Sequence, residues 1–227
     1  MCSRYSLTSP PEAVRATFGY LNEAEFPPRY NIAPTQPVAI VRNSHGGQRE
    51  LALVRWGLIP SWAKEPQKFT TLINARSETA GAKPSFRASM RHRRCIVPAD
   101  GFYEWTGKPG NKQPHMISKK SGEIMGFAGL WEHWLGADGS EIETMAILTT
   151  EANGDMAPIH DRMPVILGPE AFDVWLDCKP GSSVGLEGYL RPAPDGLLKI
   201  VAVSRELNNP RNDRPDVQQP VQGDRLL

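Results

Sequence analysis

Apolar residues along this 227-residue chain fall in short runs rather than in long helical stripes. The runs are rich in β-branched and aromatic residues and are bounded by Gly, Pro, Asn or Asp, a pattern that predicts β-strands. They are PVAIVRN (37–43), ELALVRWGLIP (50–60), RRCIVPADGFYEW (93–105), PHMIS (114–118), IMGFAGLWEHWL (124–135), TMAILTTEA (144–152), MPVIL (163–167) and LKIVAVS (198–204). Strands dominate without regular alternation with helices, so we expect a mixed, mainly antiparallel sheet curled toward a barrel.

Helical patterns are few and short. SPPEAVRATFGYL predicts a helix capped by Ser9, with prolines in its first turn and Val14, Phe18 and Leu21 on one face. Residues 74–92 predict two helical turns around Pro84, and GPEAFDVWLD (168–177) predicts a helix with three inward side chains, Phe172, Trp175 and Leu176.

The chain predicts a single α+β domain over residues 2–227, with short helices around the sheet. No linker divides it, and its 21 prolines and 20 glycines are scattered, which disfavours long helices. The polar, proline-punctuated segment from about 208 to 227 predicts an irregular tail over the surface.

Net charge points to no particular partner, because 26 Lys and Arg balance 25 Asp and Glu. A local basic cluster occurs in FRASMRHRR, which holds Arg87, Arg91, Arg93, Arg94 and His92 without an acid. Two interpretations stay open at this point, a solvated helix end and a phosphate site.

The cysteines indicate a reduced compartment. Cys2, Cys95 and Cys178 are odd in number and widely spaced, which suits neither a disulfide framework nor a zinc site, and we expect no metal and no cofactor. The sequence contains no apolar run long enough to cross a membrane and no signal-peptide core near its start. We therefore expect a soluble cytoplasmic protein that does not engage membranes.

The chain begins MCSRYS. Methionine aminopeptidases remove Met1 when the second side chain is small, so the mature chain is expected to begin with Cys2, which then carries an amine and a thiol on adjacent carbons. The alternative is that Cys2 is an inert small hydrophobe, as an isolated cysteine usually is.

Four further stretches gather residue types suited to chemistry. Each has a structural alternative: a helix cap for the amide, a solvent-facing strand position for the carboxylate, a loop network for the imidazole, and a place in the core for the aromatics. The stretches are LINARSET with Asn74 and Arg76, PADGFYEW with Glu104, APIHDRMP with His160, Asp161 and Arg162, and WGLIPSW with Trp56 and Trp62.

Taken in order, seven strings resemble the signatures of one family, the SOS-response-associated peptidase (SRAP) family. They are MCSRY, RYNIAPT, WGLIPSW, NARSET, RRCIVPADGFYEW, HDRMP and AVSRELNNPRND, and the resemblance runs from residue 2 to about residue 220. The resemblance implies the SRAP fold and a sensor of abasic sites in single-stranded DNA that crosslinks to the site through its N-terminal cysteine.

Carried over residue by residue, the resemblance implies four catalytic positions, Cys2, Asn74, Glu104 and His160. It implies four DNA contacts, Arg4, Trp62, Arg76 and Arg162. The sequence departs from the family at Ser3, where members usually have Gly. Since a Cβ restricts φ, we expect Ser3 to hinder close approach of that backbone to DNA.

The chemistry of these residues is consistent with the resemblance. An α-amine has a pKa of roughly 7.7 to 8.0, so a useful neutral fraction can attack an aldehyde at pH 7. Addition of the thiol to the imine closes a thiazolidine, and only an N-terminal Cys carries both nucleophiles at that spacing. Lyase activity is a further expectation, since an imine at an abasic sugar promotes strand cleavage. We expect the partner to be single-stranded DNA containing abasic sites, the protein to be a monomer, and its cytoplasmic pool to join the nucleoid when bound.

Two other function classes account for some of the same residues. A cysteine peptidase, including one that processes its own chain, would use Cys2 as thiolate, His160 as base and Glu104 as the orienting group. A non-catalytic binder of modified DNA would need neither Glu104 nor His160. A residue retained ahead of Cys2 distinguishes the peptidase from the DNA-crosslinking protein. A thiolate peptidase can tolerate that residue, whereas a thiazolidine requires the free amine of Cys2.

Overall fold

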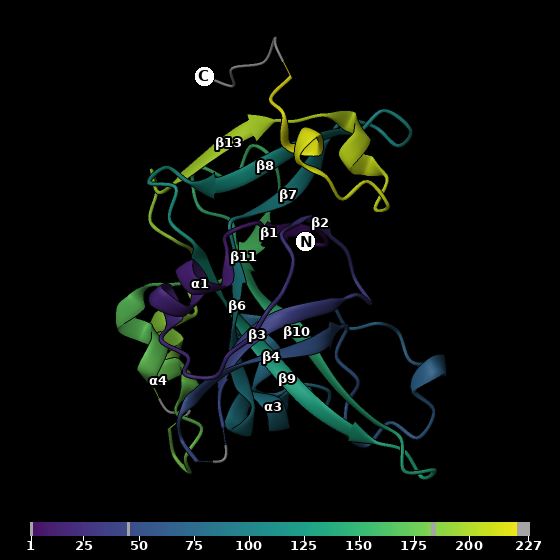
Figure 1. Ribbon diagram of the computed structural model, residues 1–227, viewed down its shortest axis with the longest axis vertical. Coiled ribbons are helices and arrows are strands. Elements are labelled where there is room, and N and C mark those ends of the chain that lie inside the picture. The colour runs from purple at the N-terminus through teal and green to yellow at the C-terminus, as the bar shows by residue number, and fades with distance from the viewer. Residues whose placement is uncertain (1, 45, 183–184, 222–227) are drawn as a thin grey trace.

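The computed structural model describes residues 2–44, 46–182 and 185–221 (Figure 1). The strands in this part of the chain are β1 (Tyr5–Leu7), β2 (Arg29–Ile32), β3 (Pro37–Asn43), β4 (Arg49–Trp56), β5 (Asn74–Arg76), β6 (Arg94–Ala99), β7 (Gly101–Thr106), β8 (Gln113–Lys119), β9 (Met125–Leu135), β10 (Glu141–Glu151), β11 (Arg162–Pro164), β12 (Ile166–Leu167) and β13 (Leu198–Ala202).

Helices are short, as the scattered prolines predict. The α-helices are α1 (Pro11–Phe18), α2 (Ser77–Ala80), α3 (Arg87–His92) and α4 (Phe172–Leu176), and the 3-10 helices are η1 (Pro66–Lys68), η2 (Pro169–Ala171), η3 (Leu186–Tyr189), η4 (Arg205–Asn208) and η5 (Pro215–Gln218).

A closed five-stranded barrel forms the lower part of the molecule in Figure 1. Strand β10 pairs with β4, β4 with β3, β3 with β6, and β6 with β9, and β9 returns to pair with β10. All of these pairings are antiparallel except β10 with β4. The prediction of a mainly antiparallel sheet curled into a barrel is therefore confirmed.

A second sheet lies above the barrel, in the order β13-β8-β7-β1-β2. Aromatic side chains join the two sheets, because the ring of Tyr5 lies 5.2 Å from that of Trp56 and the ring of Phe102 lies 5.9 Å from that of Phe127. Edge-to-face pairs of this kind add to the free energy gained by apolar burial. Strand β1, which belongs to the second sheet, is thereby fixed against the barrel.

Helices α1 and α4 cover one side of the barrel (Figure 1). The ring of Phe18 in α1 lies 5.2 Å from that of Phe172 in α4. Gly126 in β9 allows this close packing, because a Cβ there would lie 2.9 Å from both Ile96 and Phe18. The prediction of inward residues in α4 is confirmed, since Phe172, Trp175 and Leu176 are buried.

The first predicted helix needs two corrections. Helix α1 begins at Pro11 without a side-chain cap, because the Ser9 hydroxyl donates instead to the carboxylate of Asp100 (2.6 Å). Leu21 lies beyond the helix and is 65 % exposed, while Val14 and Phe18 are buried. The helix ends at Gly19, whose φ of 68° places it in the left-handed region.

Other strand predictions hold with changed boundaries. The run 93–105 forms two strands, β6 and β7, which meet at Asp100. The run 163–167 also divides, into β11 and β12. Three strands were missed, β1, β2 and β5, because each has only three or four residues and no apolar alternation of its own.

The basic cluster of residues 87–94 is partly structural. Arg94 is 1 % exposed, and its guanidinium donates to the carbonyl oxygens of Met90 and Trp175, both at 2.7 Å. Arg93 forms an ion pair with the buried Glu132 at 3.0 Å. A phosphate site built on Arg94 is therefore wrong, because its donors are already used to join α3 and α4.

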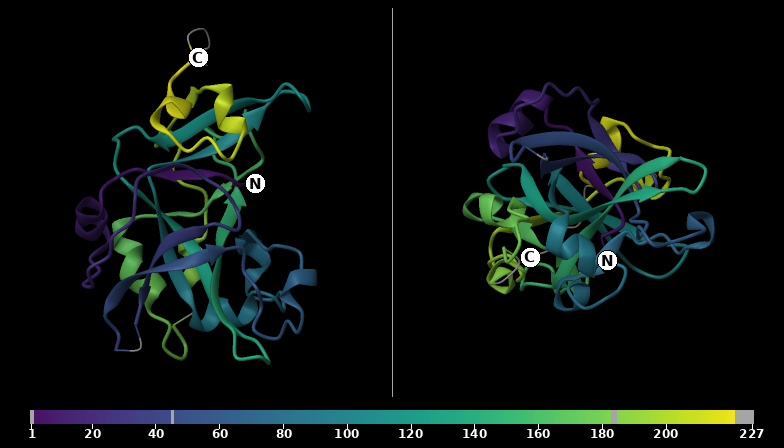
Figure 2. Two further views of the ribbon diagram at one scale, coloured as in Figure 1. Left: turned by 45° about the vertical axis from the view of Figure 1, so that its right-hand side comes forward. Right: turned by 90° about the horizontal axis from the view of Figure 1, so that it is seen from below.

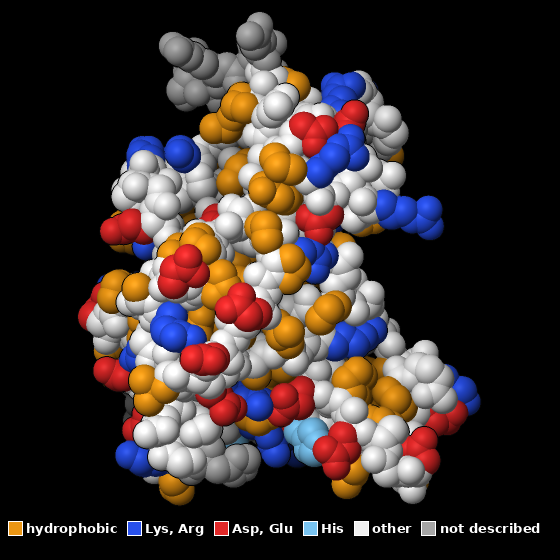
Figure 3. Space-filling model, in the orientation of Figure 1, with side chains coloured by type: hydrophobic (Ala, Val, Ile, Leu, Met, Phe, Trp, Pro, Cys, Tyr) orange, Lys and Arg blue, Asp and Glu red, His pale blue; other side chains and the backbone are white. Residues whose placement is uncertain are grey.

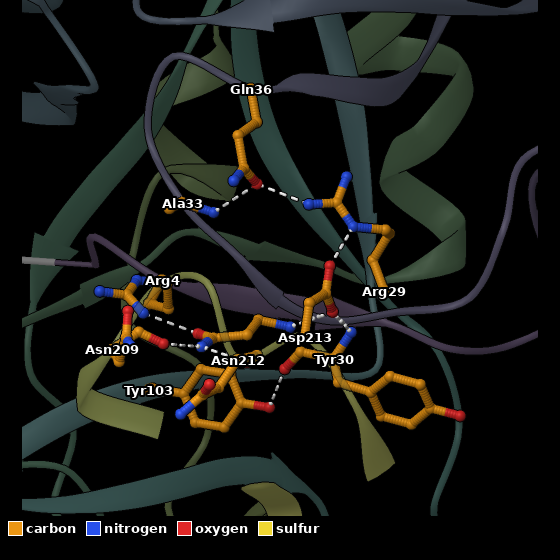
Figure 4. A network of polar contacts seen from close by, with 10 residues as sticks. Arg4, Arg29, Tyr30, Ala33, Gln36, Tyr103, Asn209, Asn212 and Asp213 are labelled. Carbon is orange, nitrogen blue, oxygen red and sulfur yellow. Dashed lines mark hydrogen bonds and ion pairs between the residues drawn. The ribbon is translucent and has the colours of Figure 1, made fainter. Parts of the chain in front are cut away.

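The described part of the predicted irregular tail, residues 208–221, lies largely without regular structure over the surface but is attached to the body. This segment contains η5, buries Val217 completely and pairs Val203 with Pro220. Asp213 attaches this segment to β2, since its carboxylate accepts hydrogen bonds from the backbone nitrogens of Tyr30 (2.6 Å) and Asn31 (3.0 Å) (Figure 4). The predicted removal of Met1 and residues 222–227 lie outside the described residues.

Candidate active site at the start of the chain

Cys2 lies in the interior, directly before β1. It is 0 % exposed, and its thiol donates to the carbonyl oxygen of Arg4 (Sγ–O 3.7 Å). Burial raises the pKa of the Cys2 thiol, and the negative charge of Glu104 raises it further. The thiol is therefore held protonated beside a carboxylate.

Glu104 reaches this position through strand pairing. Strand β1 runs antiparallel to β7, with Tyr5 opposite Phe102, and the Tyr103 amide donates to the Arg4 carbonyl (3.0 Å). The residues before Tyr5 consequently lie beside those after Phe102.

The carboxyl of Glu104 is 5 % exposed, so the alternative of a solvent-facing position is wrong. Burial raises the pKa of this carboxyl, and a positive charge on His160 opposes the shift. A carboxyl with a raised pKa close to the first residues of the chain is suited to accept and return protons.

Asn74 begins β5, which pairs in parallel with β10. Its side-chain nitrogen donates to the carbonyl oxygen of Cys2 at 2.7 Å. The alternative of a helix cap is wrong, because α2 begins at Ser77 and this amide bonds to Cys2 instead. Asn74 therefore fixes the backbone that carries the thiol.

His160 lies in the loop between β10 and β11, which is closed by hydrogen bonds from the amides of Ile159 and His160 to Met156. Its Nδ1 is 2.9 Å from the backbone nitrogen of Arg162 and also 2.9 Å from a carboxylate oxygen of Asp161. A single nitrogen cannot accept from the first and donate to the second.

In the neutral ring, Nδ1 accepts the hydrogen bond from the Arg162 backbone N–H. The ring proton is therefore on Nε2. The carboxylate of Asp161 is 88 % exposed and becomes the partner of Nδ1 when the ring is doubly protonated. His160 thus has a defined neutral tautomer and a partner for its charged form.

The three predicted arginine contacts differ in how they are held. Arg162 forms a two-pronged ion pair with Glu78 (2.7 and 2.9 Å) and also donates to the Thr149 carbonyl (2.6 Å). Arg4 donates to Asn31 (2.7 Å). Arg76 is exposed at the end of β5, immediately after the site strand.

Trp62 and Trp56 have different roles. Trp56 is fully buried, and its indole nitrogen donates to the Ile73 carbonyl (2.9 Å), so it belongs to the core. Trp62 is 55 % exposed in the loop between β4 and β5, where its ring meets the edge of Phe69 at 5.3 Å. Figure 2 shows this loop projecting from the body of the molecule. Phe69 was missed because no strand or motif surrounds it.

Ser3 does not strain the backbone. Among the described residues other than glycine, only Thr35 has a positive φ (72°), so a Cβ at Ser3 is accommodated. The φ of Ser3 thus needs no glycine, and its effect on the approach of the backbone to DNA stays a prediction.

A concave surface adjoins the start of the chain. In Figure 3 the outline is indented on the right, between the upper sheet and the projecting loop, and Lys, Arg and hydrophobic side chains edge the indentation. The N label of Figure 1 lies beside this region. Within the described ranges no group of three or more His, Cys, Asp or Glu is arranged to hold a metal, and no helix there is long and apolar enough to cross a membrane.

Comparison with known proteins gives relatives over nearly the whole chain. The abasic site processing protein YoqW of Bacillus subtilis is 40% identical over 221 residues, covering 96% of this chain and 98% of that protein. The abasic site processing protein HMCES of Gallus gallus is 34% identical over 235 residues, covering 89% of this chain and 69% of that protein.

Solved structures show the same fold. A crystal structure of a protein from Bacteroides thetaiotaomicron superposes with a TM-score of 0.85 at 27% identity, covering 97% of this chain and all of that one. A second, from Bordetella bronchiseptica, has a TM-score of 0.76 at 32% identity and covers 89% of this chain and all of that one.

The family itself is defined by the sequence match. Residues 1–210 match the profile described as SOS response associated peptidase (SRAP). Together with the relatives and the shared fold, this match means that the chain belongs to the SRAP family.

Proposed function

We propose that this protein senses abasic sites in single-stranded DNA and captures them covalently through the amine and thiol of Cys2, after Met1 has been removed. The observation that carries the proposal is that two of the predicted site residues act on Cys2. Asn74 donates a hydrogen bond to its carbonyl oxygen, and the charge of Glu104 raises the pKa of its thiol. Relatives at 40% and 34% identity carry the name abasic site processing protein, which supports the DNA lesion as the target.

The reaction balances without a cofactor. The Cys2 amine adds to the open sugar aldehyde and gives a carbinolamine, which loses water to form an imine. The thiol then adds across the C=N bond: sulfur bonds to carbon and the thiol proton goes to nitrogen. The resulting thiazolidine removes the imine and with it the route to β-elimination and strand cleavage.

Two groups of the site supply the proton transfers. His160 is proposed to donate to the ring oxygen as the closed sugar opens, since its neutral tautomer carries the proton on Nε2. Glu104 is proposed to take the proton from the amine and return it to the departing hydroxyl, because burial raises the pKa of its carboxyl and makes it a better proton acceptor. Any lyase activity would come from an imine that escapes ring closure.

The surrounding side chains suit a single strand. Arg76 is exposed beside the site, and its forked guanidinium group is proposed to contact a phosphate. Arg4 and Arg162 are proposed to contribute positive charge to the same path, although Arg162 is already paired with Glu78. Trp62, backed by the edge of Phe69, offers a ring on which an unpaired base can stack. Single-stranded DNA is therefore the proposed partner, and we propose that the protein binds it as a monomer.

A peptidase that uses a Cys2 thiolate is less compatible with this geometry. Reactive thiolates have lowered pKa values near cationic groups, whereas burial and Glu104 raise the pKa of the Cys2 thiol. A proton-bearing thiol suits the last step of thiazolidine closure, in which its hydrogen is transferred to nitrogen.

Intact mass measurement after incubation with a single-stranded oligonucleotide bearing one abasic site tests the proposal. The expected product has the mass of the chain from Cys2 plus the oligonucleotide, less one water, and it survives heating. A variant with one extra residue ahead of Cys2, confirmed by mass, is the matched control and forms no thiazolidine. Absence of adduct from the processed chain, or an equally stable adduct from the extended one, would refute the proposal.

A further inference from the structure

A pocket of about 390 Å³ opens directly beside the proposed reaction site. It is lined by Ser3, Arg4, Trp105, Gly110, Lys112 and Asn208. Ser3 is the neighbour of Cys2, and Trp105 is the neighbour of Glu104 on β7. A ligand group attached to the sugar at Cys2 would therefore meet this pocket next.

The walls of the pocket are held by hydrogen bonds from η4. The Trp105 indole nitrogen donates to the side-chain oxygen of Asn208 (2.6 Å), and the Asn208 amide donates to the Lys112 carbonyl (3.2 Å). The β7–β8 turn requires Gly107, whose φ is +92° and where a Cβ would lie 2.7 Å from the Asn111 carbonyl oxygen. The indole and the backbone of Lys112 thus have fixed positions.

Arg4 is held from behind, as the network in Figure 4 shows. Its Nη1 donates to the Asn31 side chain (2.7 Å) and to the Leu207 carbonyl (3.1 Å), and Asn31 is completely buried. Asn31 in turn donates to the carbonyl oxygens of Asn209 (3.1 Å) and Asn212 (2.8 Å). The described part of the C-terminal tail therefore orients this guanidinium, which lies 5.6 Å from the centre of the Trp105 ring.

The pocket carries two positive charges, those of Arg4 and Lys112, that form no ion pair within the described residues. Across the described ranges, neither Arg4 nor Lys112 pairs with a carboxylate, and the Lys112 side chain is exposed. The positive charge of Lys112 lowers the pKa of the Glu104 carboxyl, although burial raises that pKa by more. Lysine, arginine and an indole around one space are the groups that bind a phosphate next to a base.

We infer that this pocket binds the nucleotide adjoining the abasic sugar, with its phosphate at Lys112 and Arg4 and its base against Trp105. The inference rests on the proposed function and extends it, since it adds Lys112, Trp105 and Asn208 to the DNA-binding residues. Asn208 is a positioning residue, because it acts through the indole and the Lys112 backbone.

The test measures equilibrium binding to oligonucleotides that carry a tetrahydrofuran abasic analogue, which cannot react. In a matched series, one phosphate at a time around the analogue is replaced by a neutral methylphosphonate. Lys112→Gln should weaken binding to the parent oligonucleotide several-fold and lower the slope of log affinity against log salt by about 0.7, the value for one phosphate on a single strand. It should have no effect on the one oligonucleotide whose adjoining phosphate is already neutral.

Lys199→Gln is the matched control, because Lys199 is exposed on β13 outside the pocket. It should leave affinity and salt slope unchanged throughout the series. Lys112→Gln losing the same factor on every oligonucleotide, or on none, would overturn the phosphate assignment.

Trp105 is tested in the same assay by removing the base that adjoins the analogue. Trp105→Leu should cost about tenfold with the base present, the scale of one base stacked on an aromatic ring, and little without it, while Trp105→Phe retains most of the affinity. Equal losses with and without the base would overturn the base assignment. Crosslinking of the wild type to a natural abasic site is scored separately, so a failed pocket is distinguished from a failed proposed function.

Discussion

The side-chain amide of Asn74 donates a hydrogen bond to the carbonyl oxygen of Cys2 across 2.7 Å, although the two residues are 72 positions apart in sequence. This contact orients the start of the chain relative to β5. Asn74 therefore positions both nucleophiles of Cys2, the amine and the thiol.

Asn74→Ala should slow capture of an abasic site about tenfold to a hundredfold, because a displaced nucleophile loses the benefit of its fixed orientation. Asn74→Asp keeps the shape but cannot donate, so it should be slowed at least as much. Quenched time courses with saturating oligonucleotide measure both rates. An Asn74→Asp variant that reacts at the wild-type rate would rule out the donor role.

Cys2→Ala retains an N-terminal amine, and it should still form an imine but no thiazolidine. The imine is reduced by borohydride and hydrolyses on heating, and strand cleavage by β-elimination should rise. Gel analysis with and without borohydride separates these products. A heat-stable adduct from Cys2→Ala that does not depend on borohydride would contradict the role of the thiol.

His160 and Glu104 are expected to differ in the substrates for which they matter. His160→Ala should slow reaction with a natural abasic sugar, which must first open, but should affect an aldehyde that cannot cyclise much less. Glu104→Gln should slow both, on the scale of about 10²- to 10⁴-fold for positioned acid–base groups. Rapid-quench experiments with the two substrates decide the matter, and equal factors for both variants on both substrates would refute the division.

The raised pKa of Glu104 makes stability depend on pH. Because the folded carboxyl holds its proton more tightly than the unfolded one, the free energy of unfolding falls as pH rises from the ordinary glutamate pKa of about 4.3 through the folded value. Glu104→Gln should lack this decrease and be the more stable protein at neutral pH. Urea unfolding across that range measures it, with the exposed Glu151→Gln as control. A difference between wild type and Glu104→Gln that stays constant with pH would contradict the prediction.

Asp213 should be important for folding as well as for the position of Arg4. Asp213→Ala leaves the amides of Tyr30 and Asn31 without their acceptor and the Arg29 guanidinium without its carboxylate. We expect a loss of about 2–3 kcal/mol in the free energy of unfolding.

Asp216→Ala is the matched control, because it removes a half-exposed pair with Arg214. Exposed pairs of this kind contribute at most about 1 kcal/mol. Denaturant unfolding compares the two variants, and equal losses would show that the Asp213 contacts are not special.

Sequence periodicity determined most of the elements of this fold. Apolar runs identified every strand of the barrel, and the inward face of α4 followed from the spacing of Phe172, Trp175 and Leu176. The residue types and strings also indicated the family, and with it Cys2, Asn74, Glu104 and His160.

Contacts between distant segments were decided only by tertiary structure. Strand β1 has three residues and forms because β7 and β2 pair with it. No local sequence pattern predicts this pairing. Arg94 and Asp213 look like surface charges in the sequence. Their burial against carbonyls and amides follows from which elements pack together, and hydrogen-bond satisfaction then fixes their roles.

The same distinction applies to the site. Local chemistry indicates that an N-terminal Cys carries two nucleophiles, but it does not indicate that the thiol is buried beside Glu104 or that Asn74 holds its carbonyl. Those features depend on bringing β1, β5 and β7 to one place. A sequence encodes such proximity only through the summed packing of the whole chain, so the residues could be predicted and their geometry could not.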